Sequence, residues 1–170
     1  QKHPESDSAV AEYHRSADKL KAWKKSFPNA KVCIGNHDER IHRMSASVGI
    51  PSMYLKDYEE IFDTPNWSWG YEWEVDGISY IHGTGGASGT TPSFNMAKAK
   101  MQSTVSGHVH SVAGINWGQG PNAKKLFGFN VPCGVDTSHR LMQYGKNFIR
   151  KPVNGAGVVI DGHPYMEIMV

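Results

Sequence analysis

The sequence predicts an α/β fold, a mixed β-sandwich flanked by helices. Apolar residues recur at helical spacing early in the chain, strand-like runs prevail later, and Asp-Gly pairs separate two pairs of those runs. Because helices come mainly first and strands mainly later, we expect this sandwich rather than an alternating βαβ barrel. With 170 residues, no repeat and no evident linker, we expect a single domain over residues 1–170.

The first predicted element is a helix that ends at Pro28. Ser6 and Asp7 fit its N-cap, and apolar residues then follow at three- and four-residue intervals. The predicted inner face consists of Val10, Tyr13, Ala17, Leu20, Trp23 and Phe27. A short buried strand over residues 31–34 follows this helix.

The sequence of residues 40–63 predicts helical segments, interrupted at residues 49–51 by Gly-Ile-Pro. We expect four aromatic or aliphatic side chains on their inner side. These are Tyr54, Tyr58, Ile61 and Phe62.

The second half of the chain predicts hairpins and short strands. Asp76-Gly77 joins the alternating run 71–75 to residues 78–81, and Asp161-Gly162 joins residues 158–160 to 165–170. Between the two hairpins we expect a Gly/Ser/Thr loop over 83–93, a helix over 94–101, and strands over 103–106, 113–117 and 126–131.

Composition sets limits on the function. A formal charge of +2 is too small to indicate a nucleic-acid or membrane surface, and no apolar run approaches the ~18 residues of a membrane span. Cys33 and Cys133 share no metal-ligand spacing and lie in apolar runs, so we expect buried free thiols in a reducing, cytoplasmic compartment.

Three polar clusters each follow a strand-like run: Asn36-His37-Asp38, His82-Gly83 and the sequence Gly-His-Val-His at 107–110. Loops at strand ends commonly carry ligands and catalytic groups in α/β proteins. Neutral imidazoles bind divalent transition metals, an asparagine oxygen suits a mixed N/O shell, and the adjacent glycines let the backbone approach an ion.

Each cluster also has a structural alternative. A single histidine after a strand is more often a hydrogen-bonded structural residue, and Asn-His-Asp can form an Asx turn with a helix cap. Three such clusters at three strand ends favour the functional interpretation. We expect His3, His14, His42 and His163 at the surface. For His139 we favour a solvent-facing loop, with an approach to the site as the alternative.

The sequences GNHDE (35–39), IHG (81–83) and GHVH (107–110) resemble the later motifs of the calcineurin-like metallophosphoesterases in order and spacing. The resemblance implies a four-layer αββα sandwich with a two-metal centre. It implies that Asn36, His82 and His108 bind one ion and His110 the other. The ions would be two divalent cations, Mn²⁺ first, with Fe, Ni or Zn as alternatives.

The same resemblance implies catalytic roles for His37 and Asp38. His37 would protonate the leaving oxygen of a phosphoester and Asp38 would orient its ring, while the two cations activate the attacking water. Arg40, His42 and Arg43 follow this loop and would bind substrate phosphates, although a solvated helix face is the commoner role for such residues. Trp67, Trp69 and Trp73 would stack on a base or, as the favoured alternative, belong to an aromatic core.

The family's earlier motifs, Asp-x-His and Gly-Asp-x-x-Asp, are not found. We expect roughly 35–60 residues before Gln1 to carry them within a first βαβ segment. We therefore expect residues 1–170 alone to bind at most one metal weakly and to be inactive.

The sequence thus predicts a metal-dependent phosphoester hydrolase, with a phosphodiester as the leading substrate. Two alternatives stay open. One is a nuclease of the same family acting on nucleotides or nucleic acid, and the other is a non-catalytic binding or scaffold protein if the chain starts at Gln1. We expect no membrane partner, and the sequence leaves the oligomeric state open.

Overall fold

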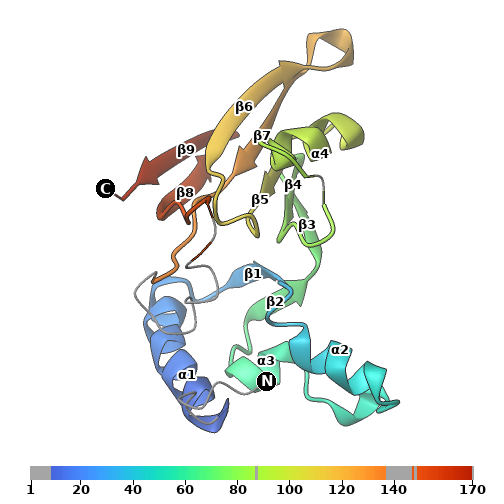
Figure 1. Ribbon diagram of the computed structural model, residues 1–170, viewed down its shortest axis with the longest axis vertical. Coiled ribbons are helices and arrows are strands. Elements are labelled where there is room, and N and C mark those ends of the chain that lie inside the picture. Colours follow the sequence, from blue (N-terminus) through green and yellow to red (C-terminus); the bar gives the residue numbers. More distant parts are fainter. Residues whose placement is uncertain (1–8, 87, 137–146, 148, 170) are drawn as a thin grey trace. The chain divides into compact units, whose positions relative to one another are not determined.

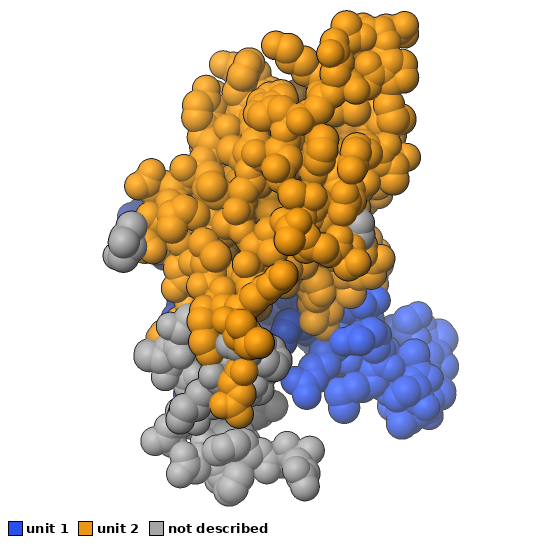
Figure 2. Space-filling view, turned by 45° about the horizontal axis from the view of Figure 1, so that its top comes forward, with its two compact units in different colours: residues 1–32, 37–70 blue, residues 33–36, 71–170 orange. Residues whose placement is uncertain are grey.

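The computed structural model describes residues 9–86, 88–136, 147 and 149–169 (Figure 1). The chain divides into two compact units, coloured separately in Figure 2. Unit 1 comprises Gln1–Val32 and His37–Gly70, and unit 2 comprises Cys33–Asn36 and Tyr71–Val170. Over its described part the protein is of the mixed α/β type, with four α-helices and three sheets.

Unit 1 contains three α-helices, a short 3₁₀ helix and most of a two-stranded sheet in which β1 pairs with β2. In chain order its elements are α1 (Ala9–Ser26), β1 (Ala30–Cys33), α2 (Arg40–Ser47), η1 (Ser52–Tyr54), α3 (Tyr58–Phe62) and β2 (Trp67–Gly70). The predicted first helix and the strand after it are confirmed, whereas β2 was not predicted. The predicted inner face of the helix is wrong in part, because Tyr13, Trp23 and Phe27 are 41%, 59% and 52% exposed.

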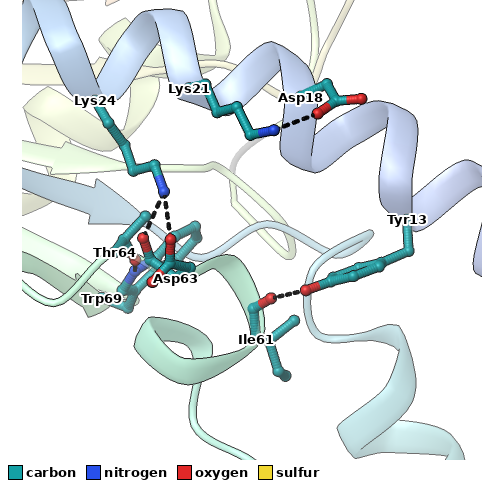
Figure 3. A network of polar contacts seen from close by, with 8 residues as sticks. All are labelled: Tyr13, Asp18, Lys21, Lys24, Ile61, Asp63, Thr64 and Trp69. Atoms are coloured by element: carbon teal, nitrogen blue, oxygen red, sulfur yellow. Dashed lines mark hydrogen bonds and ion pairs between the residues drawn. The ribbon is translucent and has the colours of Figure 1, made fainter.

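Polar contacts tie α1 to the segment around α3 (Figure 3). The Tyr13 hydroxyl donates to the Ile61 carbonyl oxygen at 2.7 Å. The Lys24 ammonium group donates to both the carbonyl and a carboxylate oxygen of Asp63, each at 2.8 Å. Asp63 ends α3 in the left-handed conformation, so Lys24 satisfies polar groups at a helix C-terminus.

An aromatic cluster forms the interior of unit 1. The ring of Trp69 stacks on Phe62 and on Tyr58, with centroids 5.0 and 5.5 Å apart, and Trp67 is buried. The Trp69 Nε1–H also donates to Thr64 Oγ1 at 3.1 Å. These contacts give Trp67 and Trp69 a structural role, as the aromatic-core alternative expects.

Two further expectations for unit 1 are wrong. Tyr54 is 74% exposed rather than on the inner side, because η1 ends at the extended residue Leu55 and the helical period does not continue to Tyr58. His42 is half-buried rather than at the surface, since its ring packs against Tyr58 with centroids 4.9 Å apart.

Unit 2 is built around a five-stranded mixed sheet in the order β3-β4-β5-β7-β6. The β4–β5 and β5–β7 pairs are parallel, and the two outer pairs are antiparallel. Its elements are β3 (Glu72–Val75), β4 (Ile78–Ile81), α4 (Pro92–Lys100), β5 (Thr104–Ser106), β6 (Gly114–Gln119), η2 (Pro121–Ala123), β7 (Lys125–Asn130), β8 (Gly155–Ile160) and β9 (His163–Ile168).

Both predicted Asp-Gly hairpins are confirmed. Asp76 and Gly77 have φ values of 52° and 73°, and Asp161 and Gly162 have values of 50° and 75°. Positive φ at both central residues is the requirement of a type I′ turn, which matches the twist of the two strands it joins.

Neighbouring residues of β7 show how unit 2 is layered. A Cβ at Gly128 would lie 2.1 Å from the backbone of Phe94, so α4 packs directly on this face of the sheet. On the other face, a Cβ at Gly157 of β8 would lie 2.3 Å from the Phe129 ring. Because successive residues of a strand point to opposite faces, the main sheet lies between α4 and the β8–β9 hairpin. The core between sheet and hairpin centres on Ile78, Val105, Phe127 and Phe129.

Two further expectations concern cysteines and membranes. Cys33 and Cys133 are both free thiols, as predicted, although each is half-buried rather than fully buried. None of the helices in the described part of the chain has the length and apolar character needed to cross a bilayer.

Candidate metal centre

Three of the predicted ligands lie at one edge of unit 2, where strands end. His82 directly follows β4, and His108 follows β5 by two residues. Because β4 and β5 are parallel neighbours, their carboxyl ends meet at the same edge of the sheet. Asn36 reaches this edge from the short segment that follows β1, which also belongs to unit 2.

The side chains of these three residues converge on one point. His82 Nε2 lies 2.9 Å from Asn36 Oδ1, and His108 Nδ1 lies 3.2 Å from the same oxygen. The two ring nitrogens are themselves 3.2 Å apart, with the rings edge to face. Two nitrogens and one oxygen therefore form a nearly equilateral triangle of donor atoms, which we call the Asn-His-His triad.

The triad fits a divalent transition metal. Ligand atoms about 2.1 Å from such an ion lie about 3.0 Å apart at right angles and about 3.4 Å apart in a tetrahedron. The observed separations of 2.9 to 3.2 Å match this spacing. Without an ion, both ring N–H groups can donate to Asn36 Oδ1, whose two lone pairs accept them. A divalent cation that replaced the two N–H protons would be bound by His82 Nε2, His108 Nδ1 and Asn36 Oδ1 together.

His108 sits in an unfavourable backbone conformation. Its φ is +67°, and the Val109 N–H donates to the Gly107 carbonyl oxygen at 2.8 Å, so His108 is the central residue of a γ-turn. A γ-turn with positive φ is rare and strained for a residue with a side chain. Strain of this kind persists where the surroundings impose it and is concentrated at functional sites.

Gly83 lets the two histidine-bearing loops approach each other. The Gly107 N–H donates to the His82 carbonyl oxygen at 3.1 Å, which continues the β4–β5 pairing into the loops. Gly83 has a φ of +104°, and a Cβ there would lie 3.3 Å from the Gly107 carbonyl oxygen and 3.5 Å from His108 Cβ. A side chain at this position would strain its own backbone and press on the turn that carries His108.

A buried polar cluster supports the same strand ends. The hydroxyl oxygens of Ser93 and Ser106 lie 2.6 Å apart, and the Ser93 N–H donates to Asn130 Oδ1 at 3.0 Å. Ser106 is the last residue of β5, directly before the turn that carries His108. The cluster therefore fixes the end of β5 to the N-terminus of α4.

Sequence reasoning missed this cluster. Asn130 is only 3% exposed, and its Nδ2 has no hydrogen-bond partner in the described structure. The available signal was the position of Ser106 and Asn130 within the predicted strands 103–106 and 126–131, at or next to the strand end. Polar residues at such positions usually serve hydrogen bonds rather than packing.

The fourth predicted ligand, His110, lies in the turn that follows His108. Its ring is half-buried, and its carbonyl oxygen accepts the Val153 N–H at 2.8 Å. Among the described residues, no three histidine, cysteine, aspartate or glutamate side chains are grouped as a metal shell. The Asn-His-His triad combines two such residues with an amide, and the role of His110 stays a prediction.

The predicted catalytic and substrate-binding residues belong to unit 1. His37 is exposed and Asp38 half-buried in the turn before α2. Arg40 is the first residue of α2, and Arg43 Nε lies 3.7 Å from a carboxylate oxygen of Glu39. The pairing of Arg43 agrees with a solvated helix face, and the catalytic and phosphate-binding roles stay predictions.

Two groups of unit 2 have shifted pKa values. Burial raises the pKa of the Cys33 thiol, with a smaller contribution from the negative charge of Glu72. The pKa of the Glu72 carboxyl is lowered, first by the hydrogen bond from Lys100 and then by that from Ser79. Cys33 is therefore a protonated thiol at neutral pH.

Several sequence expectations fall on residues outside the described part of the chain: the helix N-cap at Ser6 and Asp7, and the surface positions of His3 and His139. His14 and His163 are exposed as expected. Comparison of the chain with protein-family models, with curated proteins and with solved structures found no match.

Proposed function

We propose that this protein is a metal-dependent phosphoester hydrolase that acts on phosphodiesters, with a four-layer αββα fold. The observation that carries the proposal is the convergence of Asn36 Oδ1, His82 Nε2 and His108 Nδ1 within 3.2 Å of one another. These residues come from three motifs that are 46 and 26 residues apart, so neighbouring positions in the sequence do not explain their meeting.

The donor set supports a catalytic cation rather than a closed structural site. Structural zinc sites are typically four-coordinate and rich in cysteine, whereas a triad of two imidazoles and one amide oxygen leaves positions for water and substrate. A divalent cation supplies charge that polarises a phosphoryl oxygen and lowers the pKa of a water molecule. Mn²⁺ is the first candidate, and Fe, Ni and Zn suit the same ligands.

The chain's own residues divide the remaining work. His82 and His108 direct one ring nitrogen each toward the cation site. The strained turn at His108 fixes the direction of the His108 ring. His37, in the proposed role, donates an imidazole proton to the leaving alkoxide, and the Asp38 carboxylate orients that imidazole. Arg40 and Arg43 carry charge that complements the phosphates of the substrate.

The proposal is tested by hydrolysis of a generic phosphodiester, bis(p-nitrophenyl) phosphate, in the native protein that carries this chain. With Mn²⁺ present, we expect His37→Ala to lower turnover by about 10²–10⁴-fold, the usual contribution of a general acid, while metal content stays normal. His82→Ala should lose the metal as well as activity. His14→Ala, an exposed histidine on α1, is the control and should change neither.

Two outcomes would contradict the proposal. One is a saturable metal site at the triad with no hydrolysis of any phosphomonoester, phosphodiester or single-stranded nucleic acid, which would support a binding protein. The other is hydrolysis that survives His82→Ala and His108→Ala together.

A further inference from the structure

An exposed apolar surface lies on α2 and the segment through η1, within unit 1. Its six side chains are between 45% and 81% exposed. They are Ile41, Met44, Val48, Ile50, Met53 and Tyr54, and we call this surface the α2–η1 patch. The six residues lie within fourteen consecutive positions, and monomeric proteins rarely expose contiguous apolar patches larger than a few hundred Å².

The orientation of α2 is the reverse of that of an ordinary surface helix. Its least exposed residues include His42 and Ser45, while Ile41 and Met44 face solvent. A surface helix normally turns its apolar residues to the core and its polar residues to water. The His42 ring is held inward by Tyr58, so packing inside unit 1 fixes this orientation. The outward apolar row therefore indicates that another surface covers it.

The spacing of the row fits a second helix. Ile41, Met44 and Val48 stand at positions i, i+3 and i+7, the alternating three- and four-residue spacing with which two helices interlock. A second copy of the chain presents the same row, and a two-fold axis lets the two rows pack against each other. Met44 and Met53 add flexible side chains that adjust to an identical surface.

The apolar area of the patch is slightly below that of one side of a standard interface, which fits a weak contact. Each side chain of this kind carries on the order of 100 Å² of apolar surface, so six that are about two-thirds exposed offer roughly 400 Å². A standard interface takes about 800 Å² from each partner, of which roughly 450–500 Å² is apolar. The edge of the patch carries one positive and one negative side chain, Arg43 and Glu39, which pair with each other. This balance of charge does not favour a strongly charged partner.

We propose that the α2–η1 patch is a self-association surface through which two copies of this chain form a two-fold symmetric dimer. The contact uses residues outside the Asn-His-His triad and does not depend on the proposed hydrolase activity.

Sedimentation velocity of the chain between about 1 and 100 μM tests the proposal. We expect a concentration-dependent dimer with a dissociation constant in the micromolar range. Met44→Glu and Met53→Glu should each weaken it at least tenfold, because each places a charge in the centre of the contact. Both side chains are exposed, so circular dichroism should show unchanged folding. The matched control is Ile149→Glu, which changes a fully exposed isoleucine in unit 2 and should leave the dimer intact.

Three results would overturn the proposal. They are a wild-type chain that stays monomeric at 100 μM, a dimer that both glutamate variants leave unchanged, and binding to anionic lipid vesicles without self-association. The last would assign the patch to a membrane surface instead.

Discussion

Replacing Gly83 with alanine tests whether the backbone between the two histidine loops shapes the candidate metal centre. Gly83 has a φ of +104°, and an added Cβ would lie 3.3 Å from the Gly107 carbonyl oxygen and 3.5 Å from His108 Cβ. The unfavourable φ alone costs about 1–3 kcal/mol. The contact with the Gly107 carbonyl oxygen requires a shift of a few tenths of an ångström in the Gly107–His108 turn. We expect this shift to move His108 Nδ1 from its position 3.2 Å from Asn36 Oδ1.

We therefore expect Gly83→Ala to lower the free energy of unfolding by about 1–3 kcal/mol and to weaken Mn²⁺ binding at least tenfold. Urea denaturation measures the first effect and isothermal titration calorimetry the second. Gly85→Ala is the matched control: its φ is +72°, but a Cβ there meets nothing within 4 Å. This control should lose stability without losing affinity for Mn²⁺. Equal affinity in wild type and Gly83→Ala, or equal losses in both variants, would refute the reasoning.

Three further predictions concern unit 2. The Lys100 hydrogen bond lowers the pKa of Glu72 below 4.5, the ordinary pKa of a glutamate. The pair therefore stabilises the folded state fully above pH 4.5, and this stabilisation is lost as the pH falls below that value through the lowered pKa. Glu72→Gln should therefore show less loss of stability than wild type between about pH 5 and pH 3 in urea titrations; an identical pH dependence would contradict this. Burial raises the pKa of Cys33 above the ordinary thiol value of 9.0. In a variant without Cys133, the rate at which Cys33 reacts with a thiol reagent should therefore rise with pH with a midpoint above 9.0. A midpoint at or below 9.0 would contradict this. Gly128→Ala should destabilise the fold by about 3 kcal/mol or more, since the added Cβ would lie 2.1 Å from backbone atoms, whereas Gly114→Ala on the adjacent strand meets nothing within 4 Å and should be neutral in thermal denaturation. Similar melting temperatures for the two alanine variants would contradict the packing described for α4.

The hairpins were predictable because their turns depend on local chemistry. Asp76-Gly77 and Asp161-Gly162 supply the positive φ values that a type I′ turn requires, and the alternating runs beside them set the strands. The strand β2 (Trp67–Gly70) was missed because no turn signal of the Asp-Gly kind links it to its partner. Its pairing with β1 depends on a contact between distant segments.

The candidate site divides in the same way. The strand-end positions of Asn36, His82 and His108 were visible in the sequence, and parallel neighbours bring two of these ends together. The positive φ of His108 had no sequence signal. The hydrogen bond between Ser93 and Asn130 could not be predicted either, because it joins segments that are far apart in the sequence. Tyr54 shows the opposite error: it was expected on the inner side of a helical segment after the break at residues 49–51, but η1 ends at the extended Leu55 and no helical period links Tyr54 to Tyr58.

The central claim is that Asn36, His82 and His108 share one divalent cation, and the ¹⁵N resonances of the imidazole rings test it most directly. On titration with Zn²⁺, a diamagnetic probe, we predict that His82 Nε2 and His108 Nδ1 shift to values of metal-bound nitrogens and saturate together. The exposed His14 and His163 should not change. Asn36→Ala should weaken the binding of Zn²⁺ while both rings still respond. Zn²⁺-induced shifts that are absent, or equal in all four histidines, would contradict the account.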